Sequence, residues 1–188
     1  MTENPRLDPP FPLARTLVLV GMMGAGKTAV GRRLAARFAL PFVDADEEIE
    51  AAAGCSIADI FARHGEADFR NGERKVIKRL LKQPPCVLAT GGGAFMDERI
   101  RQMIRETAIS IWLKADLETL WQRVRRRGHR PLLNTENPKD TLERLMQTRY
   151  PVYAGADIAV ESSDGPLDET VERVIHDIER FLAMDARP

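Results

Sequence analysis

The chain has 188 residues, enough for one domain with a sizeable core, and 44% of them are hydrophobic, which excludes wholesale disorder. Lysine plus arginine and aspartate plus glutamate each number 28, and this near-zero net charge argues against a dedicated nucleic-acid binder. The cysteines, Cys55 and Cys86, have neither metal-ligand nor disulfide-framework spacing, and no apolar run approaches the ~18–20 residues of a membrane helix. We therefore expect a cytoplasmic globular protein with no membrane span.

The N-terminal residues 1–13 are expected to form a flexible tail. Four prolines fall within the first 12 residues, and the apolar core of a secretory signal is absent from them. Residues 14–188 contain no internal repeat and no long linker, so we expect them to form a single domain.

The most informative stretch follows the first expected strand, residues 16–20, which are apolar and β-branched. Residues 21–28, Gly-Met-Met-Gly-Ala-Gly-Lys-Thr, match the phosphate-loop pattern G-x-x-x-x-G-K-[ST] at every fixed position. Residues 29–38 then place Val30, Leu34 and Phe38 on one face of a helix. The alternative is a glycine-rich turn that binds nothing, and the agreement of the four fixed positions with both flanking elements argues against it.

This strand–loop–helix unit predicts a triphosphate site. Glycines let successive backbone N–H groups turn inward, and the helix N-terminus adds a positive partial charge. Lys27 is expected to reach the β- and γ-phosphates, and the Thr28 hydroxyl to bind Mg²⁺. The residues that we expect to bind the nucleotide here are Gly24, Ala25, Gly26, Lys27, Thr28 and Ala29.

A second short strand, residues 41–43, is expected to end in Asp44-Ala45-Asp46. Residues two apart in a strand face the same side, so both carboxylates are predicted to lie next to the phosphate loop. One could orient metal-bound water while the other accepts the proton of an attacking hydroxyl. The alternative is a helix N-cap plus a solvated acid, since Glu47 and Glu48 follow.

The rest of the chain alternates helices with strands. Helices are expected over 47–53, from an N-cap at Ser56 to Gly65, and over 68–81, 97–105, 116–124, 138–153 (interrupted near Pro151) and 167–184; strands are expected over 86–89, 109–113 and 157–160. Gly72, inside the third helix, costs ~1 kcal/mol. This alternation predicts a parallel sheet covered on both faces, with ligands at the carboxyl ends of the strands.

Two further groups of residues are candidates for ligand binding. Gly91, Gly92 and Gly93 follow the expected strand 86–89, where they permit close approach of a ligand to the backbone, although a flexible turn is the alternative. Arg70 and Arg149 are suited to bidentate recognition of a carboxylate or phosphate, although a solvated ion pair is the default for an arginine.

The basic stretch 123–133 lies in an expected excursion over residues 125–137. It could be a nucleic-acid patch, but it lacks interleaved aromatic residues for base stacking. A mobile flap that closes over the triphosphate fits better, because arginine neutralises transferring charge, Gly128 permits motion and closure excludes water. The three histidines, His64, His129 and His176, have no metal-ligand spacing.

Together these motifs resemble those of shikimate kinase, from about Thr16 to the last helix. The phosphate loop alone is shared by a vast class of proteins, whereas the ordered set is specific. Its markers are GMMGAGKT at 21–28, D-A-D at 44–46, S-I-A-D-I-F at 56–61, D-F-R at 68–70, T-G-G-G-A at 90–94, R-P-L-L at 130–133 and R-Y-P-V-Y at 149–153.

The resemblance implies a three-layer α/β/α fold like that of the nucleoside monophosphate kinases, with five parallel strands in the order 2-3-1-4-5. It implies one P-loop kinase domain with a substrate-binding segment at about 44–72 and a lid at about 124–137. The implied reaction is ATP + shikimate → ADP + 3-phosphoshikimate with Mg²⁺, a step of chorismate and aromatic amino-acid synthesis. The implied partners are these small molecules. From the charge and hydropathy we expect neither nucleic acid nor a membrane as a partner, and we expect a monomer.

The resemblance also implies individual roles. Asp46 would bind the substrate hydroxyls and act as the base, and Asp44 would hold Mg²⁺ through water, with Thr28 as direct ligand. Arg70 and Arg149 would clamp the shikimate carboxylate. Gly91, Gly92 and Gly93 would line the substrate ring. Arg123 would stack on adenine, and residues 162–166 would border it. Arg130 would lie near the γ-phosphate and would be catalytic together with Lys27 and Asp46. Arg125, Arg126 and Arg127 make the flap unusually basic and receive no role, and Asn71-Gly72 departs from the bulkier residues expected after Arg70.

Three other functions remain open at this point. The same scaffold would suit a gluconate or nucleoside monophosphate kinase. A nucleotide-controlled switch would carry the guanine signature N-K-x-D, but residues 137–140, Asn-Pro-Lys-Asp, have the wrong order. Nucleic-acid binding through residues 123–130 would show a steep salt dependence.

Overall fold

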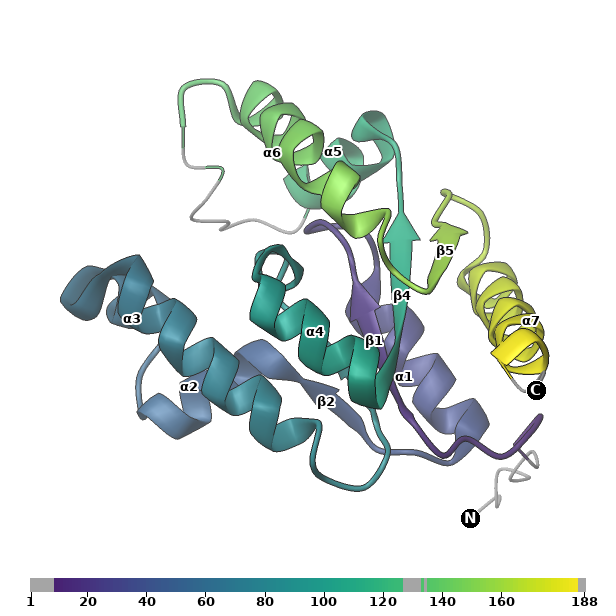
Figure 1. The fold of residues 1–188 in the computed structure, drawn as a ribbon. Coiled ribbons are helices and arrows are strands. Elements are labelled where there is room, and N and C mark those ends of the chain that lie inside the picture. Colours follow the sequence, from purple (N-terminus) through teal and green to yellow (C-terminus); the bar gives the residue numbers. More distant parts are fainter. Residues whose placement is uncertain (1–8, 127–132, 134, 186–188) are drawn as a thin grey trace, which may run out of the picture.

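A computed structural model describes residues 9–126, 133 and 135–185, and in this part of the chain five parallel strands form one sheet (Figure 1). The strands are β1 (Thr16–Val20), β2 (Phe42–Asp44), β3 (Val87–Ala89), β4 (Ala108–Lys114) and β5 (Ile158–Glu161). They lie in the order β2-β3-β1-β4-β5, so the expected order 2-3-1-4-5 is confirmed.

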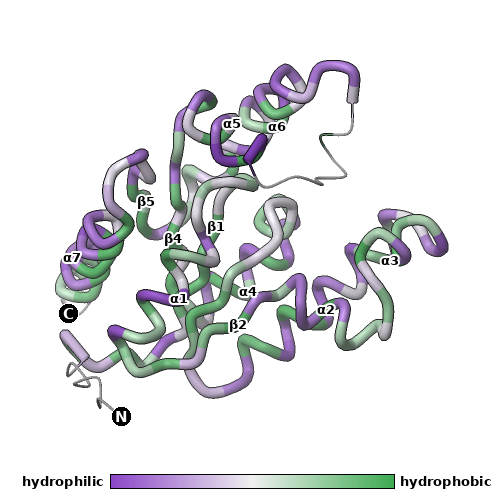
Figure 2. Tube along the Cα trace, turned by 180° about the vertical axis from the view of Figure 1, so that it is seen from behind, coloured by the Kyte–Doolittle hydropathy of each residue, from purple (hydrophilic) through white to green (hydrophobic). Residues whose placement is uncertain are grey.

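Helices cover both faces of the sheet, which confirms the expected three-layer arrangement. Helices α1 and α7 lie on one side, and α3 and α4 lie on the other (Figure 1; Figure 2 shows the molecule from behind). The helices are α1 (Lys27–Phe38), α2 (Ala45–Ala53), α3 (Ile57–Leu80), α4 (Glu98–Thr107), α5 (Leu117–Arg125), α6 (Pro138–Tyr153) and α7 (Leu167–Asp185), with a 3₁₀ turn η1 (Ala94–Met96). None of the helices in the described ranges is long and apolar enough to cross a membrane.

The central strand β1 is buried on both faces. All five of its residues are buried, which is why its sequence is a continuous apolar run rather than an alternating one. Val18 pairs with Leu88 of β3 on one side and with Ser110 of β4 on the other. The edge strand β5 alternates instead, with Ile158 and Val160 buried and the residues after each exposed. In Figure 2 the strands accordingly contribute much of the hydrophobic interior.

The second strand ends earlier than the sequence indicated, and this corrects one expectation. β2 stops at Asp44, and Ala45 already begins α2, so Asp46 belongs to a helix. The Asp44 carboxylate accepts a hydrogen bond from the backbone N–H of Asp46 at 3.0 Å and caps the helix. The expectation that the two carboxylates share a strand face is therefore wrong, because the chain turns between them.

Two residues that were expected to interrupt helices, Gly65 and Pro151, lie inside α3 and α6. Gly65, with φ 79° and ψ 177°, has a non-helical backbone, so α3 consists of two helices joined at a kink, and the expected end of the first helix at Gly65 is confirmed. The Ser56 hydroxyl accepts from the Asp59 N–H at 3.1 Å and starts α3 as expected. The expected interruption of the last-but-one helix is wrong, because α6 continues through Pro151 to Tyr153.

The start of the described chain packs against the body of the domain. The rings of Phe11 and Phe38 are 5.1 Å apart, and Arg15 forms an ion pair with Asp185 at 2.6 Å. Residues 1–8 of the expected tail lie outside the described residues.

Two helical glycines provide a test of this packing. A Cβ atom at Gly31 would lie 2.5 Å from Phe42 Cε2 and 2.9 Å from Leu19 Cδ1, whereas a Cβ at Gly72 would meet nothing within 4 Å. We expect Gly31→Ala to lower the free energy of unfolding by about 1–3 kcal/mol through overpacking. Gly72→Ala should raise it by about 1 kcal/mol, because alanine is the better helix former. Urea unfolding of both variants measures this, and a stabilised Gly31→Ala protein would contradict the tight contact of α1 with the sheet.

Candidate active site

The segment between β1 and α1 has a backbone that only glycine tolerates. Gly21, Gly24 and Gly26 have φ values of 150°, 83° and 95°. A Cβ at Gly21 would lie 2.8 Å from the Leu113 carbonyl oxygen, and one at Gly24 would lie 2.9 Å from Val124 Cγ2. The loop is therefore pressed between the end of β4 and α5, and side chains would force it open.

The helix that follows presents an uncapped N-terminus. Gly26 occupies the N-cap position of α1, and no side chain caps the helix. The N–H groups of the first turn are thus available to a bound anion. α1 begins at Lys27, two residues before the expected helix, so Lys27 and Thr28 are themselves helical. The Lys27 ammonium group turns back over the loop and donates to the carbonyls of Gly21 at 2.8 Å and Met22 at 3.0 Å.

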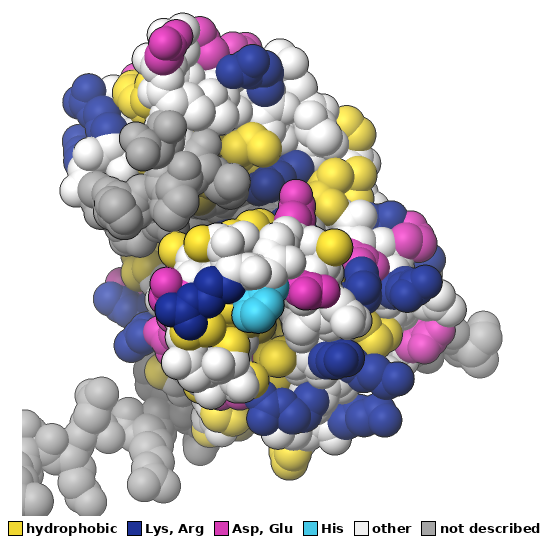
Figure 3. All heavy atoms as spheres, turned by 90° about the vertical axis from the view of Figure 1, so that its left-hand side faces the viewer, with side chains coloured by type: hydrophobic (Ala, Val, Ile, Leu, Met, Phe, Trp, Pro, Cys, Tyr) yellow, Lys and Arg dark blue, Asp and Glu magenta, His cyan; other side chains and the backbone are white. Residues whose placement is uncertain are grey.

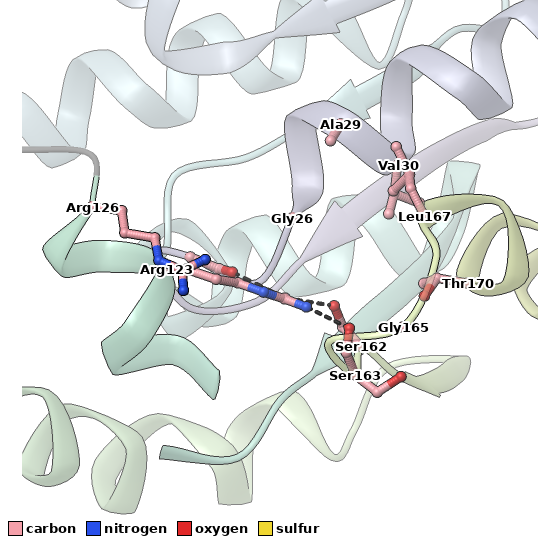
Figure 4. Close-up of a pocket in the computed structure, with 11 residues that line it drawn as sticks. Gly26, Ala29, Val30, Arg123, Arg126, Ser162, Ser163, Gly165, Leu167 and Thr170 are labelled. Carbon is pink, nitrogen blue, oxygen red and sulfur yellow. Dashed lines mark hydrogen bonds between the residues drawn. The ribbon is translucent and has the colours of Figure 1, made fainter. Parts of the chain in front are cut away.

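A pocket of about 320 Å³ adjoins this loop (Figure 4). Its walls come from the phosphate loop and α1, from α5, and from the segment between β5 and α7. The lining residues are Gly24, Gly26, Ala29, Val30, Arg123, Arg126, Ser162, Ser163, Gly165, Leu167 and Thr170. The structure therefore brings the expected adenine border at 162–166 next to the loop, and it adds Arg126, which had no expected role.

Arg123 links the walls of this pocket. Its guanidinium group donates to the Gly24 carbonyl at 3.3 Å, to the Ser162 hydroxyl at 3.0 Å and to the Ser163 carbonyl, and its Nε lies 3.3 Å from the Asp164 carboxylate. Figure 4 shows the bonds to the segment after β5. A planar guanidinium group that is held by its edge keeps its faces for stacking. This geometry is suited to stacking on an aromatic base, which is the role that the family resemblance implies for Arg123.

At the other end of the loop, the three glycines after β3 each leave room for one polar side chain. A Cβ at Gly91 would lie 2.7 Å from Asp46 Oδ1. A Cβ at Gly92 would lie 2.9 Å from Arg149 Nη1, and one at Gly93 would lie 2.5 Å from Arg70 Nη2. The sequence suggested that these glycines admit a ligand, and the structure shows that they also admit the three side chains of the site.

Arg149 is a buried cation beside the phosphate loop. It lies on α6 with 8% of its surface exposed, and its Nη1 is 3.9 Å from the Met22 sulfur. Among the described residues it forms no ion pair with a carboxylate. A buried guanidinium group without a carboxylate partner favours the binding of an anion.

Arg70 has a partner that the sequence analysis missed. Its Nη1 donates to Glu73 Oε2 at 2.7 Å, and Glu73 is only 1% exposed. Burial raises the pKa of Glu73, Arg70 opposes that shift, and Asp46 and Asp97 add to it. The spacing of three residues on one helix face could have indicated this pair, but nothing in the sequence shows that the glutamate is buried.

The expected metal ligands lie on different elements. Thr28 is the second residue of α1, and Asp44 ends β2. No group of three or more His, Cys, Asp or Glu side chains within the described ranges could hold a metal ion by itself. Arg130 and half of the expected lid, residues 127–132 and 134, lie outside the described residues.

A second hollow of about 450 Å³ lies between α3 and α4, and it is not part of this cleft. Its lining comes from helix surfaces rather than strand ends: Arg74, Lys75, Lys78, Arg99, Gln102, Met103 and Glu106. Figure 3 views the molecule from the α3 side and shows Lys and Arg side chains gathered there alongside Asp and Glu. We regard this hollow as a solvated surface between two charged helices.

Comparisons with known proteins show the family of this chain. A family model described as shikimate kinase matches residues 23–179. A shikimate kinase of Paramagnetospirillum magneticum is 57% identical over 92% of this chain and 89% of its own length, and one of Cereibacter sphaeroides is 59% identical over 86% and 81%. Among solved structures, a shikimate kinase from Acinetobacter baumannii in complex with shikimate has a TM-score of 0.86 and 36% identity, and the match covers 94% of this chain and 98% of that one.

The buried Glu73 carboxyl provides a pH-dependent test of the site. Its pKa is raised above 4.5, so the native state holds this proton at a pH where the unfolded chain has released it. The native state then binds more protons than the unfolded state, and the free energy of unfolding should fall as the pH rises from about 4.5 through the native pKa.

We expect Glu73→Gln to remove this part of the slope, measured by urea unfolding over a series of pH values. Glu66→Gln is the matched control, because Glu66 also faces Arg70, at 3.4 Å, but its side chain is 69% exposed. Equal slopes for the wild-type and Glu73→Gln proteins would show that Glu73 ionises as freely as a surface carboxylate.

Proposed function

This chain belongs to the shikimate kinase family, and we propose that its cleft transfers the γ-phosphoryl group of ATP to the 3-hydroxyl of shikimate, a step of chorismate and aromatic amino-acid synthesis. The observation that carries the proposal is the convergence of Arg70 and Arg149 on one glycine turn next to the phosphate loop. The site proposed for the phosphate donor therefore lies next to the site proposed for the acid substrate.

The two arginines are proposed to clamp the carboxylate of the acceptor. They reach residues 91–93 from α3 and α6, and a carboxylate can take hydrogen bonds from both guanidinium groups. Gly91, Gly92 and Gly93 would line the ring, because their lack of side chains leaves the backbone accessible. Arg149 supports this role most directly, since it is a buried cation beside the loop.

The nucleotide is proposed to bind along the loop and the adjoining pocket. Backbone N–H groups from Gly24 to Ala29 and the Lys27 ammonium would hold the phosphates. The face of the Arg123 guanidinium would stack on adenine, since its edge is already bonded. The role of Arg130 near the γ-phosphate rests on the family resemblance alone.

Mg²⁺ is proposed to bind between Thr28 and Asp44. Both offer oxygen, the ligand that Mg²⁺ prefers, and this ion commonly takes only one or two protein ligands beside phosphate and water. One Asp44 oxygen accepts the Asp46 N–H, which fixes the carboxylate in place. When bound, the ion would neutralise charge on the phosphates.

Asp46 is proposed to orient the acceptor hydroxyl and take its proton. Its carboxylate lies against Gly91, next to the two glycines that Arg149 and Arg70 approach. Because the transition state is loose, the proton need move only late, and the transfer can be direct, without a phosphoenzyme. Most of the acceleration would come from positioning and charge neutralisation.

We further propose that the protein acts in the cytoplasm as a monomer on small molecules alone. The balanced charge supports the absence of a polyanionic partner. Cys86 is buried, and neither cysteine forms a disulfide in the described structure, which suits a reducing compartment.

The reaction is tested by measuring ADP release with a panel of acceptors in the presence of ATP and Mg²⁺. Shikimate should consume ATP stoichiometrically, whereas gluconate and nucleoside monophosphates should not. Slow hydrolysis that ignores shikimate would instead indicate a nucleotide-controlled switch.

Removing the catalytic groups should lower turnover strongly. We expect Lys27→Ala and Asp46→Asn each to reduce kcat by roughly 10²–10⁴-fold, the scale of a lost electrostatic donor or general base. Glu47→Gln, the next acidic residue of α2, is the matched control and should keep kcat. Steady-state kinetics with saturating substrates measure the three variants.

Removing the buried arginine should affect the acid substrate alone. Arg149→Ala is expected to raise KM for shikimate by at least tenfold, because a charged hydrogen bond contributes about 1.5–3 kcal/mol. Arg144→Ala, on the exposed side of the same helix, should leave KM unchanged. If Arg149→Ala instead altered only the use of ATP, the clamp assignment would be wrong.

A further inference from the structure

Tyr153 occupies a position that the mechanism above does not use. It is the last residue of α6, one helical turn after Arg149, and none of its surface is exposed. We propose that Tyr153 is a positioning residue for the acid substrate, whose hydroxyl fixes both the Gly92 peptide and the Arg149 guanidinium group. This inference rests on the proposed function of the cleft.

The Tyr153 hydroxyl donates a hydrogen bond to the Gly92 carbonyl, whereas the Gly91 and Gly93 carbonyls accept from backbone N–H groups just after the turn. The Gly91 carbonyl accepts from Ala94 N–H at 3.1 Å, and the Gly93 carbonyl accepts from Met96 N–H at 3.1 Å. The Gly92 carbonyl accepts from the Tyr153 hydroxyl instead. Because the peptide group is planar and trans, fixing this carbonyl also fixes the direction of the Gly93 N–H. That N–H belongs to the backbone proposed to line the ring.

The same hydroxyl lies next to Arg149. The point where a Gly92 Cβ would sit is 2.9 Å from Arg149 Nη1 and 3.7 Å from the Tyr153 hydroxyl. A tyrosine hydroxyl donates one hydrogen bond and can accept others, so it can bond the carbonyl and the guanidinium group together. Burial raises the pKa of Tyr153, and the charge and hydrogen bond of Arg149 oppose this without cancelling it. The hydroxyl therefore stays protonated and keeps donating.

Aromatic neighbours fix the ring that carries this hydroxyl. Its centroid lies 6.0 Å from that of Trp112, 6.4 Å from Phe95 and 6.2 Å from Tyr150. Two of these rings come from other elements, β4 and η1, and the third comes from α6 itself, so the Tyr153 ring is packed between its own helix and two neighbouring elements. The hydroxyl is thus held in place before any substrate arrives, and this preorganisation should appear as affinity for the acid.

The chain supplies a matched control three residues earlier on the same helix. The Tyr150 hydroxyl also donates to a backbone carbonyl, that of Ala115, and its ring packs against Trp112 at 4.9 Å. Burial raises the pKa of Tyr150 to about 12, so it too remains a donor. Its bond fastens α6 to Ala115, in the segment after β4, rather than to Gly92.

The test compares Tyr153→Phe with Tyr150→Phe in the full-length protein. Each change removes one hydroxyl and keeps the ring, and urea unfolding checks that both variants fold. We expect Tyr153→Phe to raise KM for shikimate about tenfold, with KM for ATP and kcat nearly unchanged, because a lost hydrogen bond of this kind corresponds to about one decade in affinity. Tyr150→Phe should leave KM for shikimate within about twofold of the wild type.

An unchanged shikimate KM in Tyr153→Phe, or an equal rise in both variants, would overturn the proposal. Repeating Tyr153→Phe in the Arg149→Ala background adds a second readout: the rise should shrink there, and full additivity would overturn the link to Arg149. Shikimate binding by equilibrium dialysis gives the same comparison without turnover. A wild-type protein that consumes no ATP with shikimate would instead refute the proposed function, so the two failures are distinguishable.

Discussion

The site depends on the missing side chains of three consecutive glycines. Gly91, Gly92 and Gly93 are approached by Asp46, Arg149 and Arg70, each from a different helix, to distances that a Cβ atom would not permit. A Cβ atom at any of these positions would force the neighbouring charged group to move, and transfer chemistry is sensitive to small displacements of the groups that position it. The turn is therefore better described as the common floor of the site than as a flexible connection. Its carbonyls are all bonded, two within the turn and one to Tyr153.

Burying charged side chains around this glycine turn costs free energy in folding. An ion-pair partner offsets that cost for one of these side chains and not for another. Glu73 is almost fully buried and forms an ion pair with Arg70 at 2.7 Å, but burial still raises the pKa of Glu73. Arg149 is nearly as buried and has no such carboxylate among the described residues. A cation left in this state stabilises a bound anion more than a surface arginine does, because the desolvation cost is met during folding rather than during binding.

The nucleotide half of the site could be predicted from the sequence because it is local. The eight residues of the loop are contiguous, and their glycines, lysine and threonine have fixed positions relative to one helix start. The strand order followed from the family resemblance, and the sheet confirms it. The acid half is assembled from α2, α3, α6 and the turn after β3, so its contacts are not encoded by spacing. The bond of Tyr153 to the turn was missed for this reason. Glu73 was missed because the sequence does not show that it is buried, and the aspartate pair was misplaced because Asp44 turns the chain into a helix.

The two halves are in direct contact, and this constrains how the reaction can be organised. The site of a Gly92 Cβ lies 3.5 Å from the Gly21 carbonyl oxygen, which itself accepts a hydrogen bond from the Lys27 ammonium group. Arg149 touches Met22 of the same loop. The groups proposed to hold the acid thus contact the groups proposed to hold the phosphates directly. The contact lies at the end of β1, with no hinge between the two groups. An acceptor bound at this turn is placed by the same backbone that places the donor, so their relative position is set by the β1–β3 pairing of the sheet, whose residues are all buried.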